Sequence, residues 1–199
     1  MVRRILLAFS ICALLGAAPL SQHDRDFAMS HLHSTRKLFL DSIANLTPEQ
    51  WNFKPAPDRW SIAECAEHIT VSEGVIWDGI QKMLNGPAAS PEMLAQTKGK
   101  DEKVVELVPD RSSKFKAPEA LVPQHRWRTP EEVAAHFKQL RDAHIAWVDT
   151  TEADLRDHAA PHPAMGPLDA YQWVLLMSAH TQRHVEQIDE VKADPKFPK

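Results

Sequence analysis

The sequence predicts an all-α fold, a four-helix bundle, and three observations support that prediction. Apolar residues recur at helical spacing over four long segments, which is typical of helices with one buried face. Capping-box patterns, in which Ser or Thr is followed three residues later by Glu or Gln, begin at Thr47, Ser61 and Thr129. No alternating strand pattern rivals these segments. We therefore expect an up-down bundle with a long crossover loop between helices 2 and 3.

The first half of the chain contains two of the expected long helices. The first runs from Asp26 to about Leu46, and a brief helical turn follows the Thr47-Pro48 start signal. Two prolines then stiffen an ordered connection, residues 52–60. The second helix opens at Ser61 and runs to about Leu84, where Asn-Gly-Pro ends it.

The crossover, residues 86–128, contains five prolines and a charged stretch, KGKDEK. We expect short helical turns near residues 92–96 and 103–108, with the remainder laid over the bundle. The third helix begins at Thr129 and runs to about Thr150. A turn-rich connection then leads to the last helix, Tyr171 to Lys192, whose apolar interior should be largely buried.

The first residues have the layout of a secretory signal peptide. Arg3 and Arg4 precede an apolar run over residues 5–18, which is short for a membrane span. We expect residues 1–21 to be a signal peptide and residues 22–199 to form one domain, exported to the periplasm or secreted, with no stable membrane span after cleavage. The alternatives are a retained N-terminal anchor helix, or a start at Met29 that would make the protein cytoplasmic.

Composition excludes some partners. The formal net charge is −4 over 199 residues, and no basic patch interleaved with aromatic residues occurs, so we expect no nucleic-acid partner. Cys12 lies in the apolar run, which leaves Cys65 without a disulfide partner if that run is removed. Cys65 lies among apolar helical positions, where a buried small hydrophobic residue is a better interpretation than a nucleophile.

The last helix carries the clearest chemical signal. His180 and His184 are four residues apart, which places both imidazoles on one helical face about 5–6 Å apart at Cβ. Two ligands do not hold an ion, so a metal site needs a third. His68 lies beside the apolar stripe of the second helix, while His136 and His144 of the third helix are rival candidates. Each of these three histidines could instead be a packed structural residue, and for His144, which belongs to the apolar stripe, packing is the better interpretation.

Two segments resemble the DinB-like superfamily: residues 46–69, LTPEQWNFKPAPDRWSIAECAEHI, and residues 168–188, LDAYQWVLLMSAHTQRHVEQI. Their shared features are an aromatic–serine helix start, a histidine one turn beyond the cap glutamate, and a late histidine pair. The resemblance implies a four-helix bundle in which three histidines bind a divalent metal, usually as a homodimer. By position, those ligands are His68, His180 and His184.

Three neutral imidazoles leave open coordination positions for water or substrate. Imidazole suits several first-row ions, so nickel or zinc is expected first, with manganese or iron as further candidates. Glu64 and Gln187 are candidates for a general acid/base or for orienting a ligand; Glu64 could instead be only a helix cap, and Gln187 only a polar surface residue. Trp60, Trp77 and Trp173 could line a substrate cavity or fill the core.

The expected function is that of a divalent-metal-dependent enzyme acting on a small molecule, of the thiol transferase or hydrolase type. Some relatives implied by the resemblance are thiol-dependent transferases or isomerases. An exported protein would lack the cytosolic thiol pool, which counts against that chemistry here. The alternative is a non-catalytic exported dimeric bundle that binds a metal or small molecule, or one that only dimerises.

Overall fold

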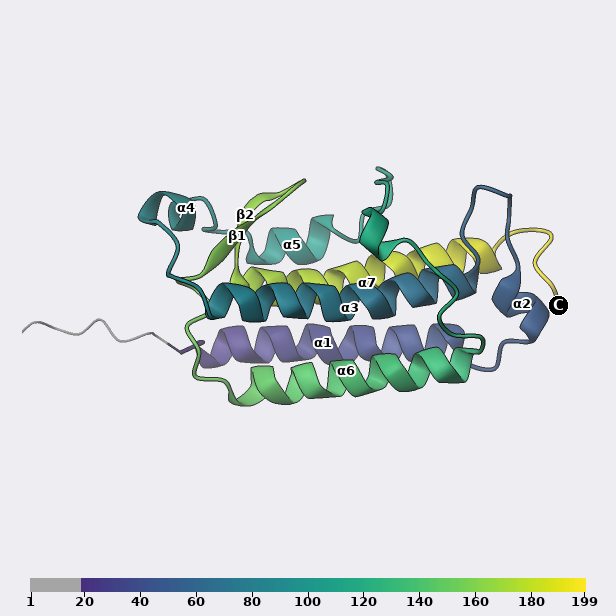
Figure 1. Cartoon of the computed structure of the whole chain (residues 1–199), viewed down its shortest axis with the longest axis horizontal. Helices are drawn as coiled ribbons and strands as arrows, with labels where there is room; N and C mark the ends of the chain where they lie inside the picture. Colours follow the sequence, from purple (N-terminus) through teal and green to yellow (C-terminus); the bar gives the residue numbers. More distant parts are fainter. Residues whose placement is uncertain (1–18) are drawn as a thin grey trace, which may run out of the picture.

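A computed structural model describes residues 19–199 and shows a bundle of four long helices (Figure 1). The long helices are α1 (Gln22–Ile43), α3 (Ile62–Leu84), α6 (Pro130–Thr150) and α7 (Ala170–Lys192). Nearly all of the expected signal peptide, residues 1–21, therefore lies outside the described residues. The prediction of an all-α four-helix bundle is confirmed.

The shorter elements lie in the connections. Helix α2 (Pro48–Asn52) follows α1, and the crossover contains α4 (Pro91–Ala95), α5 (Asp101–Leu107) and the 3-10 turn η1 (Glu119–Leu121). The two short helical turns expected in the crossover are therefore present as α4 and α5. Figure 1 shows α5 and η1 on the side of the bundle formed by α3 and α7.

The crossover determines the topology. Helix α7 packs against α1 and α3, and α6 packs against the same two helices, so α1 lies diagonally across from α3. In Figure 1, α1 and α7 run from left to right along the bundle, and α3 and α6 run from right to left. The crossover thus carries the chain the length of the bundle, and the helix directions are up, down, down, up rather than strictly alternating.

The predicted helix caps are present, with one difference. Ser61 and Glu64 make both hydrogen bonds of a capping box at the start of α3, and Thr47 does the same for α2. At α6, Thr129 accepts from the N–H of Glu132, but the Glu132 carboxylate accepts from the N–H of Arg128 instead. These caps satisfy N–H groups that the first helical turn cannot pair internally.

The connection before α7, expected to be rich in turns, forms a β-hairpin that the sequence analysis did not predict. Strands β1 (Ala159–His162) and β2 (Gly166–Asp169) pair antiparallel, with Ala159 opposite Asp169 and His162 opposite Gly166. Gly166 has a φ of 68°, a left-handed conformation suited to glycine. The hairpin escaped prediction because its strands are four residues long and proline-rich, whereas strand signals depend on longer runs of β-branched and aromatic residues.

A polar layer divides the core into two apolar clusters. One cluster includes Leu32, Ile80 and Leu175, and the other includes Phe39, Ile69 and Ile188. Between them lie buried polar side chains contributed by all four long helices: Thr35, Glu73, Arg141, His144, Ser178 and Thr181. They are linked by hydrogen bonds, with the Arg141 guanidinium donating to both oxygens of the Glu73 carboxylate at 2.7 Å.

None of the helices formed by residues 19–199 combines the length and apolar character needed to cross a membrane.

Candidate metal centre

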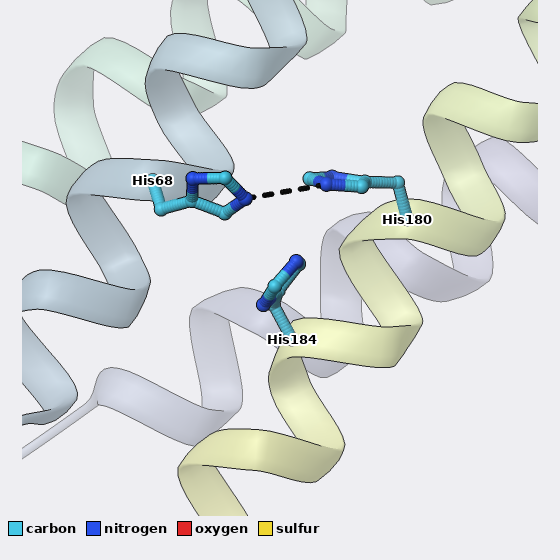
Figure 2. A group of neighbouring side chains, drawn as sticks. All are labelled: His68, His180 and His184. Atoms are coloured by element: carbon cyan, nitrogen blue, oxygen red, sulfur yellow. Dashed lines mark hydrogen bonds between the residues drawn. The ribbon is translucent and has the colours of Figure 1, made fainter. Parts of the chain in front are cut away.

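Three histidines from two antiparallel helices meet in the bundle. His68 lies near the start of α3, and His180 and His184 lie on successive turns of α7. One nitrogen from each ring lies within 4.8 Å of the others. Figure 2 shows the rings of His68 and His180 facing each other across the gap between the helices, with His184 beside them. The expectation that His68, distant in sequence, lies beside His180 and His184 agrees with the structure.

The spacing of the closest described pair of nitrogens, from His68 and His180, suits a divalent ion. The Nε2 atoms of His68 and His180 are 3.3 Å apart. Two nitrogens that bind one zinc ion tetrahedrally, each at about 2.0–2.1 Å, are about 3.4 Å from each other. Within residues 19–199, the donor group contains only these three imidazoles and no carboxylate or thiol. The residues therefore fit an ion such as zinc or nickel with open coordination positions.

Two of the rings are oriented by hydrogen bonds on their outer side. The Nδ1–H of His68 donates to the backbone carbonyl of Leu121 at 2.8 Å. The Nδ1–H of His184 donates to Oε1 of Gln187 at 2.9 Å. With the proton on Nδ1, the neutral ring has its lone pair on Nε2, which is the atom available to a metal. This is the contact that Gln187 would make if it orients His184, one of the two roles considered for it.

The environment keeps all three rings neutral. Burial, reinforced by the proximity of His68, lowers the pKa of His180 to about 3. Burial and then the neighbouring His180 and His68 lower the pKa of His184 well below its usual value. Burial also lowers the pKa of His68, although its bond to Leu121 opposes the shift. Neutral imidazole is the protonation state that binds metals.

One of the three tryptophans singled out in the sequence borders the site. The Trp60 ring centroid lies 4.9 Å from that of His68 and 6.4 Å from that of His184. Trp77 instead stacks on His144 at 4.1 Å, and Trp173 contacts His162 at 5.5 Å. Trp60 therefore forms an apolar wall beside the histidines, while Trp77 and Trp173 pack elsewhere.

The rival candidates are placed outside the histidine group. His144 is buried and its Nδ1 bonds to Glu73 at 2.9 Å, as expected for a structural histidine. His136 contacts Trp127, with 5.1 Å between ring centroids. Glu64 accepts from the Ser61 N–H at 2.7 Å and from Lys54 at 2.9 Å. Its carboxylate is thus engaged by the helix cap and an ion pair with Lys54, and the cap is one of the roles considered for it.

The crossover and its contacts with α7 contribute groups near the site that the sequence did not predict. One such group is the Leu121 carbonyl, which accepts from His68. Another is Arg111, which donates to Gln187 Oε1 at 3.4 Å and forms a two-bond ion pair with Glu190. The Arg183 guanidinium donates to the carbonyls of Val108, Asp110 and Ser113. A backbone carbonyl has no sequence signature, and Arg111 lies in a segment without helical periodicity, so neither could be placed in advance.

Known proteins resemble the chain in sequence and fold. The family model of the DinB superfamily matches residues 31–188. The uncharacterized protein YuaE of Bacillus subtilis (strain 168) is 27% identical over 164 residues, which cover 82% of this chain and 96% of YuaE. The solved structure of YfiT from Bacillus subtilis aligns with a TM-score of 0.57 at 16% identity, over 87% of this chain and 88% of YfiT. YfiT is described as a probable metal-dependent hydrolase with an unusual four-helix bundle topology.

Proposed function

The chain belongs to the DinB superfamily, and from that premise we propose that it is a metal-dependent hydrolase acting on a small molecule. The observation that carries the proposal is the group of three neutral imidazoles with nitrogens within 4.8 Å of one another. In this proposal His68, His180 and His184 hold one divalent ion, nickel or zinc before manganese or iron. The description of YfiT as a probable metal-dependent hydrolase supports the same reaction class.

The residues of the chain would each have a defined part. An ion held by three imidazoles supplies Lewis-acid activation of water or of a polarised substrate group. Leu121 and Gln187 hold the rings of His68 and His184 in the tautomer with Nε2 free. Trp60 offers an apolar surface against which part of a substrate packs beside the rings. The partial exposure of His180 and His184 leaves access from solvent.

A second candidate is thiol transfer. A substrate thiolate would complete a donor set of three nitrogens and one sulfur, which zinc accepts readily. The partial exposure of His180 and His184, through which a substrate would reach the ion, supports thiol transfer as much as hydrolysis. The alternative without catalysis is a dimeric bundle that binds a metal or small molecule.

We also propose that the protein is a homodimer exported after removal of residues 1–21. The sequence of residues 1–18, in which two arginines precede an apolar run, has the order of a signal peptide and supports export. N-terminal sequencing of the protein from its native cell envelope would test the cleavage, and light scattering of the purified protein would test the dimer. An intact start at Met1 would contradict cleavage, and a start at Met29 would favour the cytoplasm.

The first experiment is elemental mass spectrometry on untagged protein purified without chelators, beside His180→Ala and the control His136→Ala. We expect about one equivalent of a divalent ion per chain in wild type and in the control, and none in His180→Ala. The loaded protein is then assayed against ester, amide and thiol-transfer substrates. No bound metal in wild type, even after zinc or nickel is added, would contradict the metalloenzyme; metal without turnover would favour the binding protein.

A further inference from the structure

The crossover segment 108–126 contacts the histidine group directly at His68 and indirectly, through Gln187, at His184. Its Leu121 carbonyl accepts from Nδ1 of His68 at 2.8 Å, and its Arg111 side chain donates to Gln187, which accepts from Nδ1 of His184. The segment therefore supplies the outer hydrogen-bond partner of His68 and contacts the outer partner of His184. Within residues 19–199, His180 has no comparable outer partner.

A buried carboxylate attaches the second half of this segment to α3. Glu67, directly before His68, is 3% exposed, and its two oxygens accept from the N–H groups of Gln124 and Arg126 at 2.7 and 3.0 Å. A carboxylate that accepts backbone N–H bonds in a buried position makes strong, directional contacts. The hydrogen bonds of Glu67 thus fix the segment three residues beyond Leu121, next to the carbonyl that His68 uses.

An ion pair attaches the first half of the segment to α7. Arg111 donates to both oxygens of Glu190, at 2.6 and 3.0 Å, and its remaining nitrogen reaches Gln187 Oε1 at 3.4 Å. Because the Arg111 group can only donate, it turns the Gln187 amide so that the oxygen faces both Arg111 and His184. Arg183, directly before His184, holds three further carbonyls of the segment.

We propose that segment 108–126 is the outer part of the metal centre, and that Glu67 and Arg111 are positioning residues acting through Leu121 and Gln187. This inference rests on the proposed metal site. Outer partners of metal-binding histidines fix the ring and raise its basicity, and their loss commonly weakens metal binding by about 10–100-fold. By reciprocity, an ion bound to His68 and His184 also stabilises the docked segment.

The test measures zinc affinity by competition with a chromophoric chelator, using the full chain. Glu67→Gln places an amide where only an acceptor fits, and Arg111→Gln removes the donor to Gln187. The matched controls are Glu132→Gln and Arg59→Gln. The Glu132 carboxylate accepts the N–H of Arg128 at the start of α6, and Arg59 forms an ion pair with the same Glu190 without a hydrogen bond to Gln187.

We expect zinc affinity to fall about tenfold or more in Glu67→Gln and Arg111→Gln, and to change less than about twofold in the controls. The visible absorption of the cobalt-substituted protein should change in the same two variants, since it reports ligand geometry. Unchanged affinity in both variants, with wild type binding zinc, would overturn the inference and leave the proposed function standing. Failure of wild type to bind zinc would overturn the proposed function itself.

A second measurement decides the question if either variant does not fold. Hydrogen exchange of wild type is compared with and without zinc over residues 108–126. We expect zinc to slow exchange of the Gln124 and Arg126 amides, which bond to Glu67. Equal exchange rates in the two samples, under conditions where zinc is bound, would overturn the coupling between the ion and the segment.

Discussion

The guanidinium of Arg141 and the carboxylate of Glu73 form a two-bond ion pair in which both side chains are inaccessible to solvent. Burial alone would raise the pKa of Glu73, but the charge and hydrogen bonds of Arg141, with the bond from His144, bring it below its usual value. Arg141 also donates to Thr35 and Thr181, so it links α6 to α1, α3 and α7.

Loss of one partner of this pair should be costly. Arg141→Met leaves the Glu73 charge buried with His144 as its remaining partner, and we expect the free energy of unfolding to fall by about 3–5 kcal/mol. The double variant Glu73→Leu, Arg141→Met should be less destabilised than the sum of the two single variants. Urea unfolding of the three variants measures this. Additive effects would show that the two charges do not depend on each other.

Zinc should stabilise the folded protein through the three histidines. At a free concentration about 100 times the dissociation constant, one bound ion adds about 2.7 kcal/mol, or roughly 5–10 °C in melting temperature for a chain of this size. His184→Ala should lose the whole increase, because two histidines on different helices hold the ion poorly. Thermal melts with and without zinc test this, and an equal shift in the variant would contradict the site.

The metal-free protein should lose stability as the pH falls below about 6.5. His180 has a pKa near 3 when folded and an ordinary value of 6.5 when unfolded. Between these values the unfolded chain binds a proton that the folded chain excludes, so the free energy of unfolding decreases with falling pH. The slope approaches about 1.4 kcal/mol per pH unit for each such histidine, and is absent well above pH 6.5.

Urea unfolding at several pH values from about 7.5, where the slope should be absent, down to about 5, where it should be developed, measures this effect. His180→Gln should flatten the profile, while His33→Gln, at an exposed position of α1, should leave it unchanged. A wild-type profile that is flat below pH 6.5 would show that the rings are not held neutral.

Gln187 should matter for metal affinity more than for folding. Gln187→Leu removes the acceptor at His184 Nδ1, and we expect zinc affinity to drop about 10-fold. The control Gln182→Leu lies on the same helix, where its amide contacts Glu186 rather than a histidine. Isothermal titration with zinc compares the two, and equal affinities would remove Gln187 from the site.

The cap of α3, Ser61, lies about two helical turns before His68. Ser61→Ala removes the side-chain acceptor for the N–H of Glu64, and we expect a loss of about 1 kcal/mol in the free energy of unfolding. Chemical unfolding measures the loss. A neutral effect would mean that the Glu64 carboxylate, which bonds to the Ser61 N–H, holds the helix start alone.

The sequence was most informative where a local rule determines structure. Capping residues and apolar spacing predicted the ends of α3 and α7 within a few residues, and the four-residue spacing of His180 and His184 put both rings on one face. His68 could be separated from His136 and His144 only through a family resemblance, because all three lie on helices at or near apolar stripes. Helix packing, which no local pattern encodes, decided between them.

Other features depend on tertiary contacts that the sequence leaves open. Arg141 and Glu73 are 68 positions apart, and nothing in the local sequence around either residue indicates that it is buried. The direction of α6 depends on how far the crossover travels, which its prolines and charges do not specify. Gln187 was identified from its position after His184, whereas Glu67 was not, since its partners are backbone amides of a distant loop.

The histidine group closes a long stretch of chain, since His68 and His180 are separated by 112 positions. Bringing such distant positions together has an entropic cost that an ion would recover only after α7 has docked against α3. An ion bound there acts as a cross-link between an early helix and the last one. If the three histidines hold an ion, metal retention would report that synthesis and folding of the whole bundle are complete, because a chain interrupted before α7 carries one of the three proposed ligands.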